Sequence, residues 1–175
     1  MKDIPTLADS NVSKEAFYNL LREQVKALVE DQTFWVTNLS NASAIIYHSL
    51  RSLEHFQNKP INWAGFYVTD PKDPKKLILG PFQGQIACTE IPFGKGVCGT
   101  AAQTMETQIV KDVHAFPGHI ACDAASMSEI VVPLVVEGRV VGVLDIDCEQ
   151  PEGFDDQDRV GLEAVAKVII ESCVW

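Results

Sequence analysis

The sequence predicts an α+β domain in which one antiparallel sheet packs against helices from both ends of the chain. Three observations support this fold class. Helical periodicity fills the first third of the chain, branched and aromatic runs fill the middle, and helical periodicity returns after residue 155. The stretches between the strand-like runs are too short to hold a helix after every strand. A doubly wound parallel sheet is therefore excluded.

Two helices are expected before the first strand. In residues 13–30 the apolar side chains recur on one face at helical spacing, and Ser13 is a suitable N-cap. A second apolar stripe predicts a helix from about residue 33 to residue 56, and Pro60 closes this segment. The two helices together supply one face to pack on the sheet.

The central part of the chain has the composition of strands joined by short connections. The expected strands are residues 61–68, 77–82, 85–93, 106–110, 129–136 and 139–147. The proline-containing stretch 69–76 predicts a polar turn between the first two strands, and Glu137-Gly138 predicts the turn of a hairpin between the last two. Residues 94–104 predict a glycine-led loop that enters a short helix.

The last helix is expected to begin after Asp155, which is a suitable cap. Val160 and Val165 are among the residues expected to face inward. No internal repeat, low-complexity tract or interdomain linker divides the sequence. The pattern therefore predicts one domain.

The composition excludes some classes of function. Of the 175 residues, 46% are hydrophobic and 22% are charged, which is typical of globular proteins, and no apolar run is long enough to span a membrane. The N-terminal residues lack the apolar block of a signal peptide, so a cytoplasmic location is expected. A net charge of −10 argues against binding to nucleic acid or to an anionic membrane.

Three acidic residues are expected to lie together at one end of the predicted hairpin. Asp145 and Asp147 share a face of their strand, and Glu129 opens the neighbouring strand at about the same level. Such a cluster can bind an ammonium group. It can also hold one carboxyl protonated as a general acid, because nearby like charges raise a pKa. A solvated end of the sheet is the alternative interpretation.

The chain contains five cysteines, Cys88, Cys98, Cys122, Cys148 and Cys173, and an odd number without a secretory signal is a poor disulfide framework. Metal ligands, reactive thiols and inert packing residues remain as alternatives. Because no C-x-x-C pair exists, and only His119 and His114 lie near Cys122, we expect neither a metal nor another cofactor.

Three of the cysteines are candidates for chemistry. Cys98 falls where a helix begins, a position that stabilises a thiolate. Cys122 lies in a loop of small residues, and Cys88 lies in a predicted strand. Cys148 and Cys173 are interpreted as packing residues. Thiols close to carboxylates indicate a redox reaction with an acid step, and the residues alone leave peroxide, sulfoxide and disulfide substrates open.

Several segments together resemble one known family. They are NWAGFY (62–67), LGPFQG (79–84), IAC (86–88), GKGVCGTAA (94–102), HIACDAASMSEIVVPL (119–134) and GVLDID (142–147). In these motifs the chain closely resembles the free methionine-(R)-sulfoxide reductases, which are built on a single GAF domain. The resemblance implies a GAF-type antiparallel sheet over residues 1–175, with the helix at about 13–30 as an N-terminal extension.

The resemblance also implies roles for the thiols. Cys122 matches the nucleophile that attacks the sulfoxide sulfur, and the cysteine that Cys98 matches has been given the same role. We favour Cys122, because it shares a segment with Glu129. Cys88 and Cys98 are then the resolving partners, and thioredoxin reduces the resulting disulfide. The family further implies a possible homodimer.

Free methionine sulfoxide is the substrate that the resemblance implies. Glu129, Asp145 and Asp147 match the acids that bind it, and Trp63 and Tyr67 match the aromatic wall around its methyl-sulfoxide group. An acidic cluster suits the ammonium of the free amino acid, which a methionine within a protein lacks. Glu129 is the expected proton donor, with Asp147 as its rival. A GAF module that binds a ligand without turnover, or a zinc-stabilised domain, is the alternative.

Overall fold

The computed structural model describes residues 12–118 and 124–175, and the following account is confined to them. The helices are α1 (Lys14–Val29), α2 (Trp35–Ser52), α3 (Gly96–Thr104) and α4 (Asp156–Ser172), with short 3-10 turns at Glu54–Phe56 and Val113–Ala115. The strands are β1 (Ile61–Asp70), β2 (Asp73–Gly84), β3 (Glu90–Pro92), β4 (Gln108–Val110), β5 (Ser128–Val136) and β6 (Arg139–Cys148).

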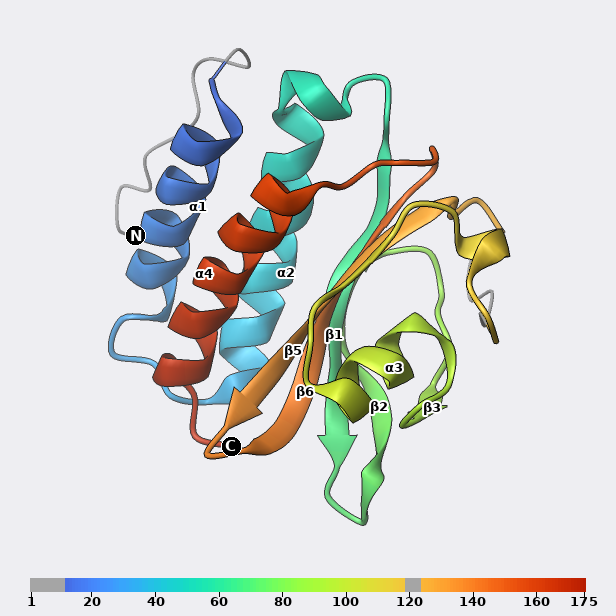
Figure 1. The fold of residues 1–175 in the computed structure, drawn as a ribbon. Helices are drawn as coiled ribbons and strands as arrows, with labels where there is room; N and C mark the ends of the chain where they lie inside the picture. The colour runs from blue at the N-terminus through green and yellow to red at the C-terminus, as the bar shows by residue number, and fades with distance from the viewer. Residues whose placement is uncertain (1–11, 119–123) are drawn as a thin grey trace.

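The described strands form one antiparallel sheet in the order β3-β2-β1-β6-β5-β4. Figure 1 shows α1, α2 and α4 side by side on one face of the sheet and the shorter α3 on the other. Each face has its own apolar cluster: Ile46, Leu144 and Leu162 belong to the large one, and Trp63, Val131 and Val143 to the smaller one under α3. The predicted antiparallel α+β fold is confirmed.

The helix ends follow the local sequence. Ser13 Oγ accepts a hydrogen bond from the backbone amide of Ala16 and caps α1, as the sequence predicts. Asp155 caps α4 as predicted, in a capping box with Asp158. Val160 was expected to face inward, but its side chain is 58% exposed, because α4 instead turns Leu162 and Ala166 toward the core.

The connections around β2 differ from the expected ones. The predicted turn at 69–76 is wrong in extent, because β1 runs to Asp70 and β2 begins at Asp73, so only two residues separate the strands. The expected strand at 85–93 is reduced to β3. Cys88 therefore lies in the irregular connection between β2 and β3 rather than in a strand.

A buried ionic contact attaches α1 to α4. Lys14 Nζ lies 2.6 Å from Asp158 Oδ2 and 2.8 Å from Asp155 Oδ2, and the hydroxyl of Tyr18 donates to Asp158 Oδ1 at 2.9 Å. The Asp158 side chain is fully buried, so these partners are what make its burial tolerable.

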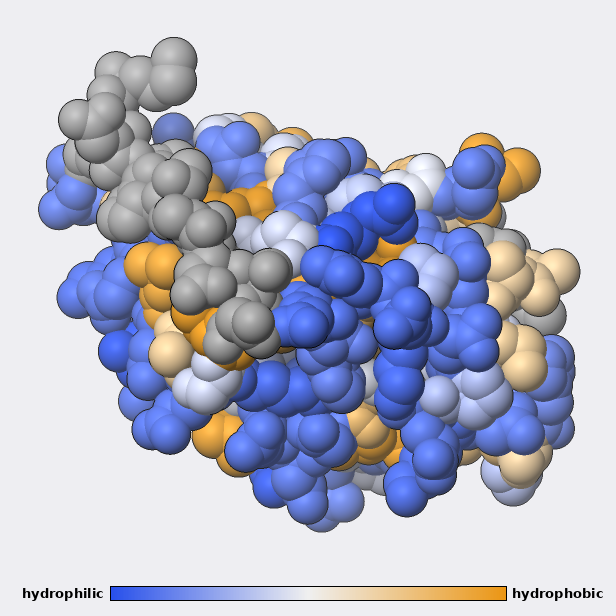
Figure 2. Space-filling model, turned by 90° about the horizontal axis from the view of Figure 1, so that it is seen from above, coloured by the Kyte–Doolittle hydropathy of each residue, from blue (hydrophilic) through white to orange (hydrophobic). Residues whose placement is uncertain are grey.

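The surface fits the acidic, polar composition. Figure 2 shows a largely hydrophilic face when the molecule is viewed from above, with small hydrophobic areas scattered over it. Within the described residues, none of the helices has the length and apolar character that crossing a membrane requires.

Candidate active site

Glu129, Asp145 and Asp147, hereafter the acidic cluster, lie on the face of the sheet that α3 covers. In the register between β5 and β6, Glu129 pairs with Asp147, and Asp145 is the residue two positions before Asp147 on the same face. Glu129 is 7% exposed and Asp145 is 6% exposed, whereas Asp147 is half-buried. The predicted cluster is therefore present, and a solvated sheet end does not describe Glu129 or Asp145.

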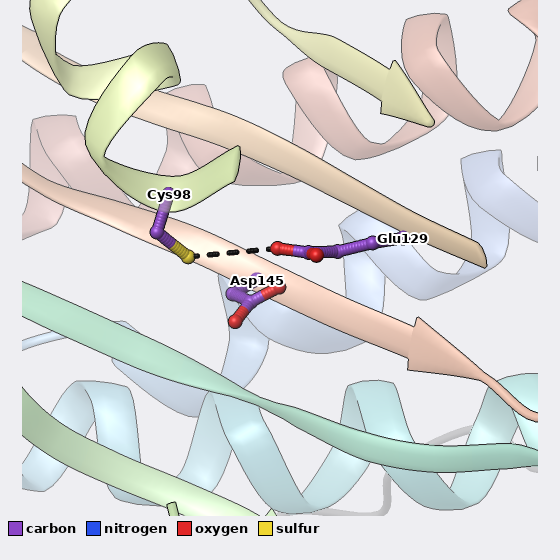
Figure 3. Close-up of side chains that lie close together, drawn as sticks. All are labelled: Cys98, Glu129 and Asp145. Carbon is purple, nitrogen blue, oxygen red and sulfur yellow. Dashed lines mark hydrogen bonds between the residues drawn. The ribbon is translucent and has the colours of Figure 1, made fainter. Parts of the chain in front are cut away.

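Helix α3 brings a thiol onto this cluster. Cys98 lies in the first turn of α3, as predicted, and its side chain is buried. Its Sγ atom is 3.8 Å from Oε1 of Glu129, which is within hydrogen-bond reach for sulfur. Figure 3 shows Cys98, Glu129 and Asp145 pointing toward one another from α3, β5 and β6. One ligand atom from each lies within 4.8 Å of the other two, so these three could hold a metal ion.

Burial makes the acidic cluster retain protons. Removal from water raises the pKa of Asp145 to about 6. The pKa of Glu129 is raised well above its usual value, first by burial and then by the negative charges of Asp145 and Asp147. These shifts favour the protonated form of the two carboxyls, which is the state that a general acid requires.

The same surroundings act on the thiol. Burial, followed by the charges of Asp145 and Glu129, raises the pKa of Cys98 well above that of a free cysteine. This is the opposite of the thiolate stabilisation expected from a helix N-terminus. The reason is that α3 places the thiol in a buried position beside two carboxyl groups, which disfavour the thiolate.

Aromatic rings from β1 lie beside the acids. Trp63 pairs with Asp147 in the register between β1 and β6, and both Trp63 and Tyr67 are buried. The two rings stack at 5.8 Å between centroids, and burial followed by the charge of Asp145 raises the pKa of the Tyr67 phenol. The aromatic wall predicted from the sequence therefore adjoins the acidic cluster.

Phe82 in β2 was not singled out from the sequence, although it belongs to the LGPFQG segment. Its ring stacks on Trp63 at 5.2 Å with an interplanar angle of 14°, on the side away from the β1–β6 pairing. Gly65 stands opposite Phe82, and a Cβ atom at Gly65 would lie 2.3 Å from Cβ of Phe82. Only glycine allows this approach. The Trp63 indole also donates to the carbonyl oxygen of Gln85 at 3.1 Å.

The remaining residues considered for the site are the other cysteines and two histidines. Cys122 and His119 lie outside the described residues. Cys88 is half-buried and disulfide-bonded, whereas Cys98, Cys148 and Cys173 are free. His114 is exposed.

Comparison with known proteins gives the family. The GAF domain family model matches residues 44–169, which run from within α2 into α4. The chain is 54% identical to the free methionine-R-sulfoxide reductase of Saccharomyces cerevisiae, over 95% of this chain and 91% of that protein. The chain belongs to the free methionine-(R)-sulfoxide reductase family of GAF-domain proteins.

Two further matches agree with this family. The free methionine-R-sulfoxide reductase of Escherichia coli is 48% identical over 86% of this chain and 85% of that protein. The structure of the free methionine-R-sulfoxide reductase from Neisseria meningitidis in complex with its substrate has a TM-score of 0.85 and is 42% identical, covering 95% of this chain and 94% of that one. Helix α1 precedes residues 44–169, the part of this reductase-family chain that the GAF family model matches.

Proposed function

We propose that this protein reduces free L-methionine (R)-sulfoxide to L-methionine, as the names of its relatives suggest. The single observation that carries the proposal is the buried acidic cluster under α3, in which Glu129 has a raised pKa beside Trp63 and Tyr67. This arrangement joins a proton donor to a place for a cation and an apolar methyl group.

The cluster selects the free amino acid by charge. Asp145 and Asp147 bind the ammonium group of the substrate, and the rings of Trp63 and Tyr67 contact its methyl-sulfoxide end. A methionine sulfoxide inside a peptide has no ammonium, so its binding would leave buried acidic groups without a cation. We therefore expect little activity on protein-bound methionine sulfoxide.

Glu129 supplies the proton for the chemical step. The thiolate of the nucleophile attacks the sulfoxide sulfur while the Glu129 carboxyl protonates the oxygen. Collapse of the adduct moves the hydroxyl to the cysteine, which becomes a sulfenic acid, and releases methionine. The cysteine sulfur loses two electrons and the sulfoxide sulfur gains them, so the cysteine is oxidised and the sulfoxide is reduced.

We assign the attack to Cys122. The raised pKa of Cys98 supports this choice, because it disfavours the thiolate that the attack requires. The 3.8 Å separation of Cys98 from Glu129 is the main argument for the alternative, in which Cys98 attacks. In our assignment the Cys98 thiol donates a hydrogen bond to Glu129, which partly offsets the rise that burial causes in the pKa of Glu129.

A second thiol then resolves the sulfenic acid and releases water, leaving a disulfide that thioredoxin reduces by exchange. Cys88 is suited to this step, since it is half-buried and is disulfide-bonded in this structure. Cys98 is the other candidate. A homodimer remains a prediction.

The direct test is an activity assay with separated epimers of free methionine sulfoxide, with thioredoxin, thioredoxin reductase and NADPH as the reducing system. We expect turnover of the R epimer and little turnover of N-acetyl-methionine sulfoxide, the matched compound without an ammonium. Equal turnover of the acetylated compound would contradict selection by the acidic cluster. Absence of turnover of either epimer would favour a non-catalytic GAF ligand-binding module.

A further inference from the structure

Cys98, Glu129 and Asp145 have the donor set of a metal site, beyond any role in sulfoxide reduction. They offer one sulfur and two carboxylate oxygens from three different elements, α3, β5 and β6. All three side chains are buried, and Figure 3 shows that their ligand atoms converge on one region. Three protein ligands with a fourth position open are the arrangement found in catalytic zinc sites.

A second observation indicates that the cluster lacks a cation. Oδ1 of Asp145 is buried without a hydrogen-bond partner within residues 12–118 and 124–175. The described lysines and arginines form no ion pair with Glu129 or Asp145. A buried carboxylate oxygen without a partner carries an energetic cost that a bound metal ion would remove.

The geometry is close to that of a bound ion. With a zinc–sulfur distance of about 2.3 Å and a zinc–oxygen distance of about 2.0 Å, tetrahedral angles place the sulfur and oxygen about 3.5 Å apart. Cys98 Sγ and Glu129 Oε1 are 3.8 Å apart, and the largest separation between the three ligand atoms is within 4.8 Å. Small side-chain movements would therefore suffice to close the site.

The donor set selects the kind of metal. Magnesium and calcium require about six or more oxygen ligands, many of them water, and do not favour sulfur. A thiolate with two carboxylates suits a borderline-soft divalent ion that accepts four ligands. We propose that Cys98, Glu129 and Asp145 bind one Zn²⁺ ion in the reduced protein.

The location gives the ion a consequence. Zinc would occupy the groups that bind the ammonium and donate the proton, so it would exclude the substrate. This consequence, unlike the metal binding itself, rests on the proposed function. The site would then be a reversible zinc-sensitive switch on the reductase.

The metal site is tested without measuring activity. The reduced, desalted protein is dialysed anaerobically against Zn²⁺, and bound metal is measured by atomic absorption. We expect one equivalent in the wild type. Loss of even an outer-shell partner weakens metal binding by about 10–100-fold, so Cys98→Ser should weaken it at least that much. The matched control is Cys173→Ser, which removes a free, half-buried thiol outside the site.

Cobalt identifies the ligand directly. Co²⁺ bound to the wild type and to Cys173→Ser should show sulfur-to-cobalt charge-transfer absorption, which Cys98→Ser should lack. Glu129→Gln and Asp145→Asn should keep this absorption and bind Co²⁺ more weakly. If Cys98→Ser does not fold, the weaker binding of Co²⁺ by these two variants tests the metal site. Absence of zinc binding, or zinc binding that is unchanged in Cys98→Ser, would overturn the proposal.

Competition separates this proposal from the proposed function. Free L-methionine (R)-sulfoxide should raise the apparent dissociation constant for Zn²⁺ in equilibrium dialysis. Zinc binding that depends on Cys98 and is unaffected by the sulfoxide would support the metal site and contradict the placement of the substrate there.

Discussion

Glu129 in β5 lies directly opposite Asp147 in β6, so two carboxyl groups face each other across neighbouring strands. Like charges in this relationship destabilise a sheet, and here Asp145 adds a third acid on the same face. Burial raises the pKa of Asp145, and burial followed by the charges of Asp145 and Asp147 raises the pKa of Glu129, so both carboxyls favour their protonated forms. In the proposed mechanism, the protonated Glu129 carboxyl is also the acid that sulfoxide reduction needs.

The raised pKa of Asp145 should make the stability of the fold depend on pH. The pKa of Asp145 is about 6 in the folded protein against 3.8 for an ordinary aspartate, so the folded state binds more protons between these values. The stabilisation is fully present below about pH 4 and is lost as the pH rises through 6. A shift of about two pKa units corresponds to about 3 kcal/mol.

Asp145→Asn removes this dependence. We expect the free energy of unfolding of the variant, relative to wild type, to increase as the pH is raised from 4 to 7. Urea unfolding at several pH values measures it. Asp156→Asn, at an exposed position of α4, is the matched control, because its exposed ion pair with Arg159 contributes little to stability. A flat difference for Asp145→Asn would mean that Asp145 titrates normally.

Glu129→Gln should slow the chemical step. Glutamine keeps the shape of the side chain but has no carboxyl proton, so single-turnover formation of methionine should fall by about 10²–10⁴-fold. In the wild type this rate should decline as the pH rises through the raised pKa of Glu129, because only the protonated acid is active.

Rapid quenching after mixing with saturating sulfoxide measures that rate. Glu171→Gln at an exposed position of α4 is the control and should be unaffected. An unchanged chemical step in Glu129→Gln would move the proton donor to Asp147.

Cys122→Ser should abolish even the first turnover. Cys88→Ser and Cys98→Ser should form one equivalent of methionine but fail to be recycled by thioredoxin, because a resolving thiol is missing. Cys173→Ser serves as the control with full turnover. The amount of methionine formed without added reductant distinguishes these cases. If Cys98→Ser loses the first turnover and Cys122→Ser retains it, the nucleophile is Cys98.

We expect Phe82 to act as a positioning residue for Trp63, on which its ring stacks at 5.2 Å. An aromatic pair contributes about 0.5–1.5 kcal/mol, so Phe82→Leu should raise KM for the sulfoxide roughly 2–10-fold and leave kcat nearly unchanged. Phe93→Leu is the matched control, since Phe93 is a half-buried ring of the same apolar cluster. A fall in kcat without a change in KM would show that Phe82 does not act through binding.

Lys14→Met should destabilise the fold. The methionine keeps the aliphatic stem but leaves the fully buried Asp158 without its cation, which typically costs about 3–5 kcal/mol. Lys167→Met removes an exposed lysine 3.9 Å from Glu171 and should cost less than about 1 kcal/mol. Urea unfolding compares the two variants. Equal, small effects would mean that Asp158 is protonated and needs no partner.

Local signals in the sequence predicted most of the fold. Ser13 and Asp155 mark helix starts through their own side chains, and the alternation of residues in the β5–β6 hairpin places Asp145 and Asp147 on one face. The same period of two, with the turn at Glu137-Gly138, placed Glu129 level with them. The predicted acidic cluster followed from these short-range rules alone.

Short-range rules were less reliable where the chain lacks a clear period. The irregular connection around Cys88 was predicted as strand, and Val160 was placed inward. In α4 the packing of Gly161 against Tyr18 sets which face is buried, since a Cβ atom at Gly161 would lie 2.0 Å from the Tyr18 ring. The partner of Gly161 is more than a hundred residues away, so its local sequence does not contain this information.

The sequence by itself determined the antiparallel α+β class, the capped helices and the acids that share one strand face, because these depend on neighbours along the chain. Only the tertiary structure decided that α3 lays Cys98 against Glu129, that Phe82 stacks on Trp63 over Gly65, and that Glu129 and Asp145 are buried. Burial has this role because the pKa of a carboxyl or a thiol depends on the water and charges around it. Those surroundings come from segments that only the folded chain brings together.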